Sequence, residues 1–361
     1  MEELYDRTGM ILAGRYRITE LLGAGSMGSV WVAEQLALRT QVVVKFREEL
    51  LIGADGEESA ARFLREARTL ASVRHRNVVE LFEVGTADTG EPYLIMEKLK
   101  GQTLGALLAA RRTLPLAEAF ALFSGIARGL EAVHAAGIVH RDVKPDNIFL
   151  VAPEDMAPED EGPPIPKLLD FGLARGTELG GGGLSSKITR AGRAVGTPGY
   201  MPSEQVRGLA DLDERVDVYA LAATFYEMLA AACPVEGESL TDVLIATAMD
   251  GPTPLDTHRP DYAGPLTMAL MRGLAVDRDS RYPTVRAMRE RLAKVIGEWE
   301  TQGVTLPPAA HTATPPAVRS GPPPIPPAAR IPARTTERPV INPPDGPRLR
   351  VPRPWRASGE G

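Results

Sequence analysis

The chain of 361 residues contains a single cysteine, Cys233. One cysteine excludes an internal disulfide framework and a zinc site built from cysteines. It suits a reducing cytoplasm and predicts that Cys233 is a small buried apolar side chain. Aromatic residues are also scarce, at 5% against 43% for all hydrophobic residues. The core must therefore consist mainly of aliphatic side chains.

Long apolar runs are missing as well. No stretch approaches the roughly 18 uninterrupted apolar residues of a membrane helix. The first ten residues, MEELYDRTGM, lack the apolar segment of a secretory signal. We therefore expect a soluble cytoplasmic protein with no membrane span.

A net positive charge is missing from the main part of the chain. From Thr301 onward there are eight Arg, no Lys and three acids, so this segment carries 8 − 3 = +5. Since the whole chain carries −6, the remainder carries −11. An acidic body argues against a nucleic-acid partner, because phosphate contacts need a basic face.

Proline is concentrated in the same basic segment, which holds 16 of the 32 prolines. Few large apolar residues accompany them, so residues 298–361 are expected to form a disordered tail with polyproline II character. Such a tail is a candidate ligand for a partner that binds proline-rich motifs. A flexible solubilising extension explains it equally well.

Hydrophobic spacing divides residues 16–297 into two parts. Alternating or β-branched segments over 15–23, 28–35, 40–46, 78–85 and 92–99 predict antiparallel strands, with one helix over 57–73. From residue 116 helical spacing dominates, including a long helix ending at Gly137 and a segment over 213–231 that is apolar nearly all round. The predicted fold class is α+β, with a small β-rich lobe (16–97) and a larger helical lobe (98–297).

Three glycines, Gly23, Gly25 and Gly28, form a G-x-G-x-x-G pattern. Alone the pattern is a weak signal, because an ordinary hairpin also uses such glycines. Here the residues after Gly28 resume a strand rather than a helix. Glycines in a strand–turn–strand allow the backbone to lie directly over phosphates.

Lys45 ends the apolar run 42–44, and a lysine on a buried strand needs a partner. Glu66, on the apolar face of the helix over 57–73, is the expected partner. The alternative is a solvated surface charge on each element.

The segment GIVHRDVKPDNIFL (137–150) places Asp142, Lys144 and Asn147 between apolar ends. A polar turn between two strands would explain it, and so would a catalytic loop on rigid flanks. Asp170 follows in KLLDFGLA. The oxygen ligands of Asn147 and Asp170 suit Mg²⁺ held together with substrate phosphates.

Taken in order, these motifs resemble the signature of protein kinases, and more closely that of bacterial eukaryotic-like (Hanks-type) serine/threonine kinases. The resemblance covers about residues 16–297. It implies a bilobal kinase-like fold, ATP and Mg²⁺ as cofactors, and transfer of the γ-phosphate of ATP to Ser/Thr hydroxyls of protein substrates. Autophosphorylation between transiently paired copies and a role in signalling also follow from the resemblance.

The resemblance implies a role for each motif residue. Asp142 would orient the substrate hydroxyl and accept its proton, and Lys144 would neutralise the γ-phosphate. Lys45 would bind the α- and β-phosphates and be oriented by Glu66, while Asn147 and Asp170 would hold Mg²⁺. The rest of the nucleotide site would consist of Gly23, Gly25, Gly28, Val30, Val43, Met96, Glu97, Leu99 and Phe149. Val43 and Phe149 are bulkier than is usual in the family, which bears on nucleotide affinity.

Further residues resemble the family's supporting positions. Asp217 would brace the catalytic loop, Glu204 and Arg281 would pair, and Thr197 would contact Asp142 and Lys144. Arg141 would bind a phosphate on the segment 170–204, with Thr189 as the expected regulatory phosphorylation site. An acidic insertion over 151–167 is longer than the family's hairpin and is most simply a solvated loop.

Two other functions fit parts of this pattern. A pseudokinase scaffold would bind nucleotide or partners without turnover, but the complete catalytic set argues against it. A small-molecule phosphotransferase generally lacks the long segment from DFG to SEQ that contains GTPGY. The sequence therefore favours a protein kinase.

Overall fold

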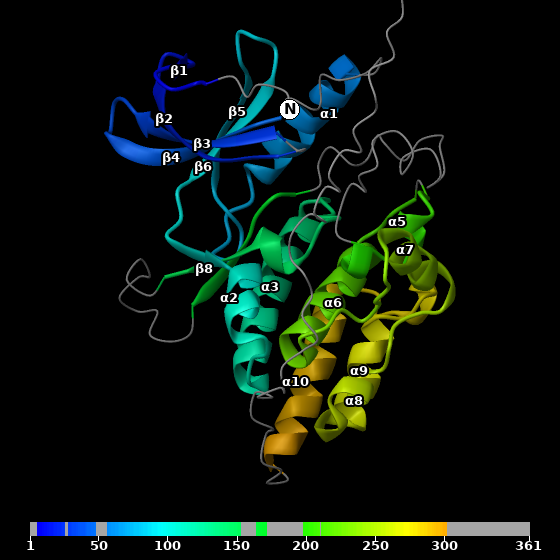
Figure 1. The fold of residues 1–361 in the computed structure, drawn as a ribbon. Helices are drawn as coiled ribbons and strands as arrows, with labels where there is room; N and C mark the ends of the chain where they lie inside the picture. The colour runs from blue at the N-terminus through cyan, green and yellow to red at the C-terminus, as the bar shows by residue number, and fades with distance from the viewer. Residues whose placement is uncertain are drawn as a thin grey trace, which may run out of the picture. The chain divides into compact units, whose positions relative to one another are not determined.

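The computed structural model describes residues 6–25, 28–47, 56–152, 164–171, 198–209 and 211–301. Its first part is an antiparallel sheet with one helix against it (Figure 1). The sheet has the strand order β1-β2-β3-β4-β6-β5. These elements are β1 (Ile11–Leu12), β2 (Tyr16–Gly25), β3 (Gly28–Gln35), β4 (Thr40–Phe46), α1 (Gly56–Leu70), β5 (Leu81–Thr86) and β6 (Pro92–Glu97).

The register of the central strands gives the sheet two different faces. Trp31 of β3, Val44 of β4 and Ile95 of β6 are cross-strand partners, and all three are buried in one apolar cluster. Because side chains alternate along a strand, Lys45 and its partner Val30 lie on the opposite face. The alternation of side chains along β4 thus keeps Lys45 out of this apolar cluster.

The folded lobe begins before residue 16, where sequence analysis placed its start. Arg7 is only 4% exposed, lies 4.0 Å from the centre of the Phe46 ring and pairs with Glu91 at 3.0 Å. Strand β1 then pairs with β2. Sequence analysis missed this segment because these contacts join residues far apart in the chain and leave no local periodicity.

The second part is mainly helical, with a small sheet of order β7-β8-β9 at its start. A helix rich in small and aliphatic residues, α6, is buried nearly all round, as predicted. The elements are β7 (Gly101–Thr103), α2 (Leu104–Arg111), α3 (Leu116–Ala135), η2 (Pro145–Asn147), β8 (Ile148–Val151), β9 (Ile165–Leu168), η4 (Pro198–Tyr200), α5 (Ser203–Val206), α6 (Arg215–Ala230), α7 (Leu240–Met249), α8 (Leu255–His258), η5 (Pro260–Tyr262), α9 (Pro265–Gly273), η6 (Arg278–Ser280) and α10 (Val285–Thr301). The predicted bilobal α+β fold is confirmed.

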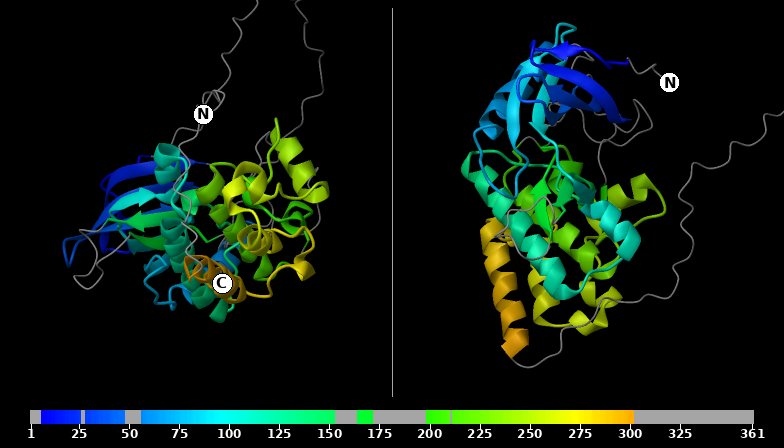
Figure 2. Two further views of the ribbon diagram at one scale, coloured as in Figure 1. Left: turned by 90° about the horizontal axis from the view of Figure 1, so that it is seen from below. Right: turned by 90° about the vertical axis from the view of Figure 1, so that its left-hand side faces the viewer.

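Helices α3, α6 and α10 pack against one another, with α10 along the outer side of this lobe (Figure 2). Phe123 of α3 and Phe225 of α6 lie with their ring centres 4.8 Å apart. At the end of α10, Trp299 stacks on Tyr262 at 6.3 Å. The expected start of the tail at residue 298 is therefore wrong: the helix continues to Thr301 because its last turns still contribute Ile296 and Trp299 to the core.

A short segment around Asn77, between α1 and β5, is attached to the helical lobe. The backbone of Asn77 and Val79 forms hydrogen bonds with Leu168 of β9 at 2.9 and 3.0 Å. Helix α3 has glycine where this segment approaches: a Cβ at Gly129 would lie 2.6 Å from the Asn77 carbonyl oxygen. Glycine in α3 thus permits the close contact.

Among the residues that the structure describes, none of the helices combines the length and apolar character needed to cross a membrane.

Candidate active site

The polar loop after α3 is held by one buried carboxylate. Asp217 of α6 is fully buried, and its two oxygens accept hydrogen bonds from the backbone N–H groups of His140 and Arg141, each at 2.8 Å. Backbone donors bound to an ionised acceptor make strong hydrogen bonds. Helix α6 therefore fixes the backbone of the loop directly before Asp142.

Sequence analysis missed a histidine that also holds Asp217. Nε2 of His134, at the end of α3, lies 2.7 Å from Asp217 Oδ2, and its Nδ1 lies 3.1 Å from Glu214 Oε2. Burial disfavours the charged imidazole, but Asp217 and Glu214 outweigh burial and raise the pKa of His134. The only sequence signal for this contact was a histidine in the last turn of the helix that precedes the loop.

His140 was also missed, although it lies inside the motif. Its Nε2 is 2.8 Å from the Leu169 carbonyl oxygen, and its ring centre is 4.5 Å from that of Phe171. Complete burial lowers the pKa of His140, against the opposing charge of Asp217. The neutral ring therefore links the catalytic loop to the DFG segment.

Asp142, Lys144 and Asn147 form one cluster, as the sequence pattern suggested. The side-chain amide of Asn147 donates to Asp142 Oδ2 and to the Asp142 carbonyl oxygen, both at 2.8 Å. Lys144 Nζ lies 3.6 Å from Asp142 Oδ2. The carboxylate thus has a fixed orientation with a cation beside it.

Lys45 is paired with a different carboxylate from the one expected. Its Nζ lies 2.6 Å from Asp170 Oδ1, and the lysine side chain is only 7% exposed. Partial burial favours the neutral acid, but Lys45 outweighs it and holds the pKa of Asp170 below its usual value. The expected Lys45–Glu66 pair is not present, because Asp170 already satisfies the buried ammonium group.

Glu66 is half-buried on α1. Burial raises its pKa, while the charges of Arg141, on the catalytic loop, and of Arg62 act in the opposite direction. Glu66 thus lies within the field of the Arg141 charge and forms no ion pair with Lys45 among the described residues.

The face of the sheet that carries Lys45 also carries the predicted adenine-site residues. Val43 is the cross-strand partner of Met96, and both side chains are partly exposed, Val43 between two buried neighbours and Met96 next to buried Ile95. Val30 on β3, Phe149 on β8 and Leu99 after β6 are likewise partly exposed. Apolar side chains left open beside a lysine are typical of a site for a ligand with an apolar ring and an anionic group.

Glu97 differs from these residues because its side chain is already bonded. Its Oε1 accepts hydrogen bonds from Lys167 Nζ at 2.6 Å and from the Glu80 N–H at 2.7 Å. These bonds hold the side chain within the protein, which is compatible with the expectation that Glu97 and Leu99 meet adenine through their backbone. The Lys167 contact joins the end of β6 to β9.

The glycine motif lies at the tip of the β2–β3 hairpin, so the strand–turn–strand reading is correct. Gly25 pairs with Gly28, and Gly28 has a φ of 103°, which disfavours any other residue. At Gly23 and Gly25 a Cβ would meet nothing within 4 Å. No atom of the described residues therefore fills the space in front of these two positions, which leaves room for a phosphate.

Glu204 and Arg281 form a buried bidentate pair. The distances are 2.6 Å from Nη1 to Oε1 and 2.9 Å from Nη2 to Oε2. The Arg281 side chain is 0% exposed and that of Glu204 is 5% exposed. This pair joins α5 to the segment before α10.

Several expected features lie outside the described residues. These are Thr189, Thr197, most of the acidic insertion and the proline-rich tail. Within the described ranges, no group of three or more His, Cys, Asp or Glu side chains is arranged to hold a metal ion.

The fold and the arrangement of these side chains resemble those of the protein-kinase class, and comparison with known families agrees. The model of the protein kinase domain matches residues 16–290, more than half of the chain. The chain therefore belongs to the protein kinase family. The resemblance to bacterial serine/threonine kinases is confirmed.

Curated relatives include serine/threonine-protein kinases pkn3 and Pkn1 of Myxococcus xanthus. The first is 32% identical over 292 residues (80% of this chain, 51% of pkn3), and the second 35% identical over 290 residues (80% of this chain, 39% of Pkn1). PknB of Mycobacterium tuberculosis is 31% identical over 288 residues, 79% of this chain and 43% of PknB. The matched part is thus about half or less of each of these relatives.

A solved structure of similar fold is that of Rad53 1-466 in complex with AMP-PNP. The two chains are 20% identical with a TM-score of 0.59, and the match covers 77% of this chain and 65% of that one. This likeness supports the fold alone.

Proposed function

We propose that the chain is an ATP-dependent protein serine/threonine kinase with its catalytic domain over residues 7–301. The observation that carries this proposal is the cluster of Asp142, Lys144 and Asn147, oriented by hydrogen bonds and backed by Asp217. The Lys45–Asp170 pair supplies a buried cation and a carboxylate. Together these groups match the needs of phosphoryl transfer, which are positioning and charge neutralisation.

In the proposed reaction the oxygen of a Ser or Thr hydroxyl attacks the γ-phosphorus of ATP. The new O–P bond forms while the bond from the γ-phosphorus to the bridging oxygen breaks, and ADP leaves with that electron pair. Asp142 orients the hydroxyl and accepts its proton, while Lys144 neutralises charge on the transferred group. Lys45 binds the nucleotide phosphates.

The residues present also fit Mg²⁺. The amide nitrogen of Asn147 is bonded to Asp142, and its side-chain oxygen accepts no hydrogen bond from the residues that the structure describes. That oxygen and the carboxylate of Asp170 are hard donors, which Mg²⁺ prefers when it is bound together with substrate phosphates. When bound, the ion would neutralise phosphate charge.

Autophosphorylation at Thr189 is a further part of the proposal. The sequence SSKITRAGR places Lys187, Arg190 and Arg193 around this threonine. A phosphate there would bring nearly two negative charges, and Arg141 is a candidate partner for it. If one copy acts on another, the specific rate of autophosphorylation should rise with protein concentration.

The test compares wild type with Asp142→Asn in transfer of labelled phosphate from ATP to a generic protein substrate. Transfer should be lost in the variant while ATP binding, measured by calorimetry, is retained. Equal transfer in both proteins would contradict the role of Asp142. ATP binding without transfer in wild type would instead favour a nucleotide-binding scaffold.

A further inference from the structure

Arg47 follows the last residue of β4 and belongs to none of the motifs described above. Its N–H donates to the Pro92 carbonyl oxygen at 2.9 Å, so the ladder between β4 and β6 continues through this residue. Because side chains alternate along a strand, Arg47 lies on the same face of the sheet as Lys45. Val43, Lys45 and Arg47 therefore form a row on this face, with successive members about 7 Å apart along the strand.

The row leads from the expected adenine end of the nucleotide site to its phosphate end. Val43 lies at the first end, beside the predicted adenine-site residues. At the second end, Phe46 pairs with Ser29, the residue after the last glycine of the glycine motif. Arg47 comes next along the strand, so it lies closer to the glycine turn than Lys45 does. It therefore places a second positive charge on the phosphate side of Lys45.

Arg47 also forms a contact between the sheet and helix α1. At 6% exposure it is buried, which is unusual for an arginine. Its Cζ lies 5.3 Å from the centre of the Phe63 ring, which belongs to α1 and is 0% exposed. A guanidinium over an aromatic ring is attracted to it, and burial strengthens the attraction. Because Phe63 precedes Glu66 by about one helical turn, Arg47 connects the strand that carries Lys45 with the helix that carries Glu66.

The charge of Arg47 acts in addition on Asp170, the partner of Lys45. Burial favours the neutral form of Asp170, but the charges of Lys45 and, second to it, Arg47 hold the pKa of this carboxyl below its usual value. Two cations of one row therefore stabilise a single carboxylate. Lys45 contacts it directly, with Nζ 2.6 Å from Asp170 Oδ1. Arg47 is the cation that stays when Lys45 moves, because its guanidinium is held on Phe63.

We propose that Arg47 is a positioning residue for phosphoryl transfer, which keeps Asp170 and α1 in place while Lys45 moves from Asp170 to the phosphates of ATP; the proposal rests on the kinase function proposed above. Without Arg47, Asp170 would lose its cationic partner in the protein at that moment and become free to reorient. Misplacement of a reacting group by about 1 Å can cost about 10²-fold in rate. Arg47 acts through Asp170 and Phe63 and does not itself need to touch the transferred phosphate.

The test measures kcat and the KM for ATP with a generic protein substrate, in wild type and in Arg47→Met. Methionine keeps an unbranched side chain against Phe63 but removes the charge. We expect kcat to fall about tenfold and KM to change by less than about threefold, the pattern of an interaction made only in the transition state. The Kd of ADP, measured by calorimetry, should stay close to that of wild type. Arg47→Lys keeps the charge without the planar group, so it should recover part of the lost kcat.

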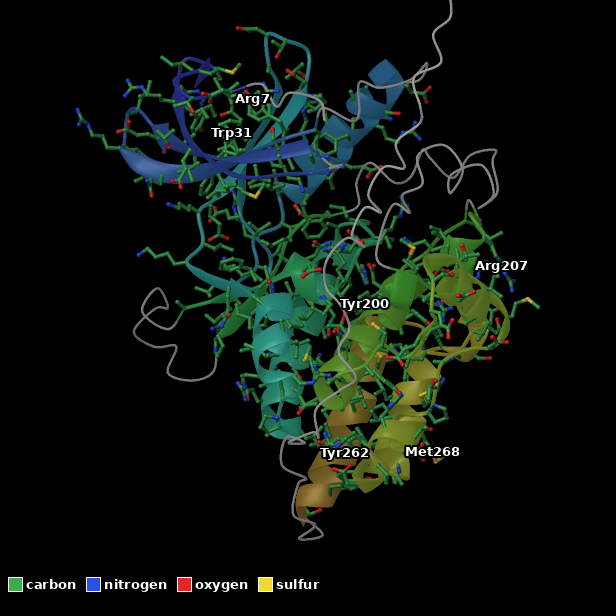
Figure 3. All side chains as sticks on the ribbon, viewed as in Figure 1. Arg7, Trp31, Tyr200, Arg207, Tyr262 and Met268 are labelled. Atoms are coloured by element: carbon green, nitrogen blue, oxygen red, sulfur yellow. The ribbon has the colours of Figure 1, made fainter. Side chains whose placement is uncertain are left out.

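Arg7→Met is the matched control. Arg7, labelled in Figure 3, is 4% exposed and lies 4.0 Å from the centre of the Phe46 ring, on the opposite face of the same sheet. The variant therefore removes a similarly buried contact between an arginine and an aromatic ring, but not from the nucleotide face. Its melting temperature should fall at least as far as that of Arg47→Met, because the ion pair with Glu91 is lost as well. Its kcat should stay near that of wild type.

Phe63→Leu tests the link through α1. Leucine fills much of the same space but removes the ring, so kcat should fall as it does in Arg47→Met. When both changes are combined, kcat should be close to that of Arg47→Met alone, because the two side chains act through one contact. The losses from two independent sites would instead multiply.

Other results would overturn the proposal. These are a wild-type kcat in Arg47→Met, an equal loss of kcat in Arg7→Met, a raised KM with unchanged kcat, or multiplied losses in the double variant. If Arg47→Met does not fold, Phe63→Leu and Arg47→Lys decide, and a wild-type kcat in both would overturn it. These outcomes leave the kinase function intact, since wild type still transfers phosphate. No transfer by wild type to any protein substrate would overturn the kinase function and the role of Arg47 with it.

Discussion

At the scale of single residues, Lys45 has the most direct consequence for activity. We expect Lys45→Met to reduce autophosphorylation by about 10²–10³-fold, because it removes a preorganised positive charge from the phosphate site. The measurement is the rate of autophosphorylation, with a thermal melt to show that the variant is folded.

Lys167→Met is a matched control for this experiment. Lys167 is also a largely buried strand lysine, and it also pairs with a carboxylate at 2.6 Å, that of Glu97. Its loss should affect activity far less than the loss of Lys45. A near wild-type rate in Lys45→Met would contradict the assignment of Lys45.

His134 makes stability depend on pH in a defined direction. The pKa of His134 is raised above its usual 6.5 in the folded protein. Its stabilising effect is therefore fully present below pH 6.5 and is lost as pH rises through the raised pKa. The groups that face it are Asp217 and Glu214, with Glu131 on its own helix.

His134→Gln should accordingly lower the free energy of unfolding by about 2 kcal/mol at pH 6, the contribution typical of a hydrogen bond to a charged group. The difference from wild type should shrink as pH rises above 6.5. Denaturant unfolding at several pH values measures it. A difference that stays constant with pH would show that the imidazole acts only through its shape.

At the scale of elements, the Glu204–Arg281 pair determines how α5 is held. Besides Glu204, Arg281 donates to the carbonyl oxygens of Ala275, Val276 and Arg215. Arg281→Met should therefore cost about 3–5 kcal/mol, because it leaves a buried carboxylate without its partner. The measurement is the free energy of unfolding in denaturant.

Arg281→Lys tests whether charge alone is sufficient. Lysine keeps the positive charge but cannot match the fork of a guanidinium, so most of the loss should remain. Full recovery in this variant would show that the geometry of the pair is unimportant.

Elements with strong local patterns were predicted well from sequence. The strands expected over 28–35 and 40–46 have those bounds in the structure, because period-two alternation ends sharply at turn residues. The long helix ends within two residues of the predicted Gly137. The order of the motifs along the chain identified the candidate site residues, and the resemblance to protein kinases supplied the role of each.

What sequence could not give was the pairing between elements. Whether Lys45 meets Glu66 or Asp170 depends on where α1 lies against the sheet, and no local pattern reports that position. His134 was missed because one histidine at a helix end carries no signal of the buried aspartate below it.

At the scale of the whole molecule, the end of α10 sets the limit of the folded body. Leu292 and Val295 are fully buried and Ile296 is 5% exposed. Loss of one large core side chain costs about 2–5 kcal/mol, and a domain has only about 5–15 kcal/mol in total. Truncation after residue 290, where the family match ends, should therefore abolish folding.

Truncation after Thr301 should leave the melting temperature and activity nearly unchanged, because the removed sequence is rich in proline and poor in large apolar residues. Thermal melts of the two truncated proteins beside the full chain make the comparison. A large fall in melting temperature on truncation after Thr301 would show that the tail packs on the folded body.

The attachment of the Asn77 segment to α3 and β9 determines how α1 can move. The carboxyl end of α1 leads directly into this segment, which is fixed to the helical lobe, whereas no backbone hydrogen bond among the described residues holds the amino end of α1 to that lobe. Any rotation of α1 as a rigid helix should therefore take place about its carboxyl end, near Leu70. A rotation about that point moves Glu66, one turn away, through a short arc and moves Gly56 much further. A partner that binds the amino end of α1 would consequently adjust the position of Glu66 in small steps, because a large displacement at Gly56 gives only a small displacement at Glu66.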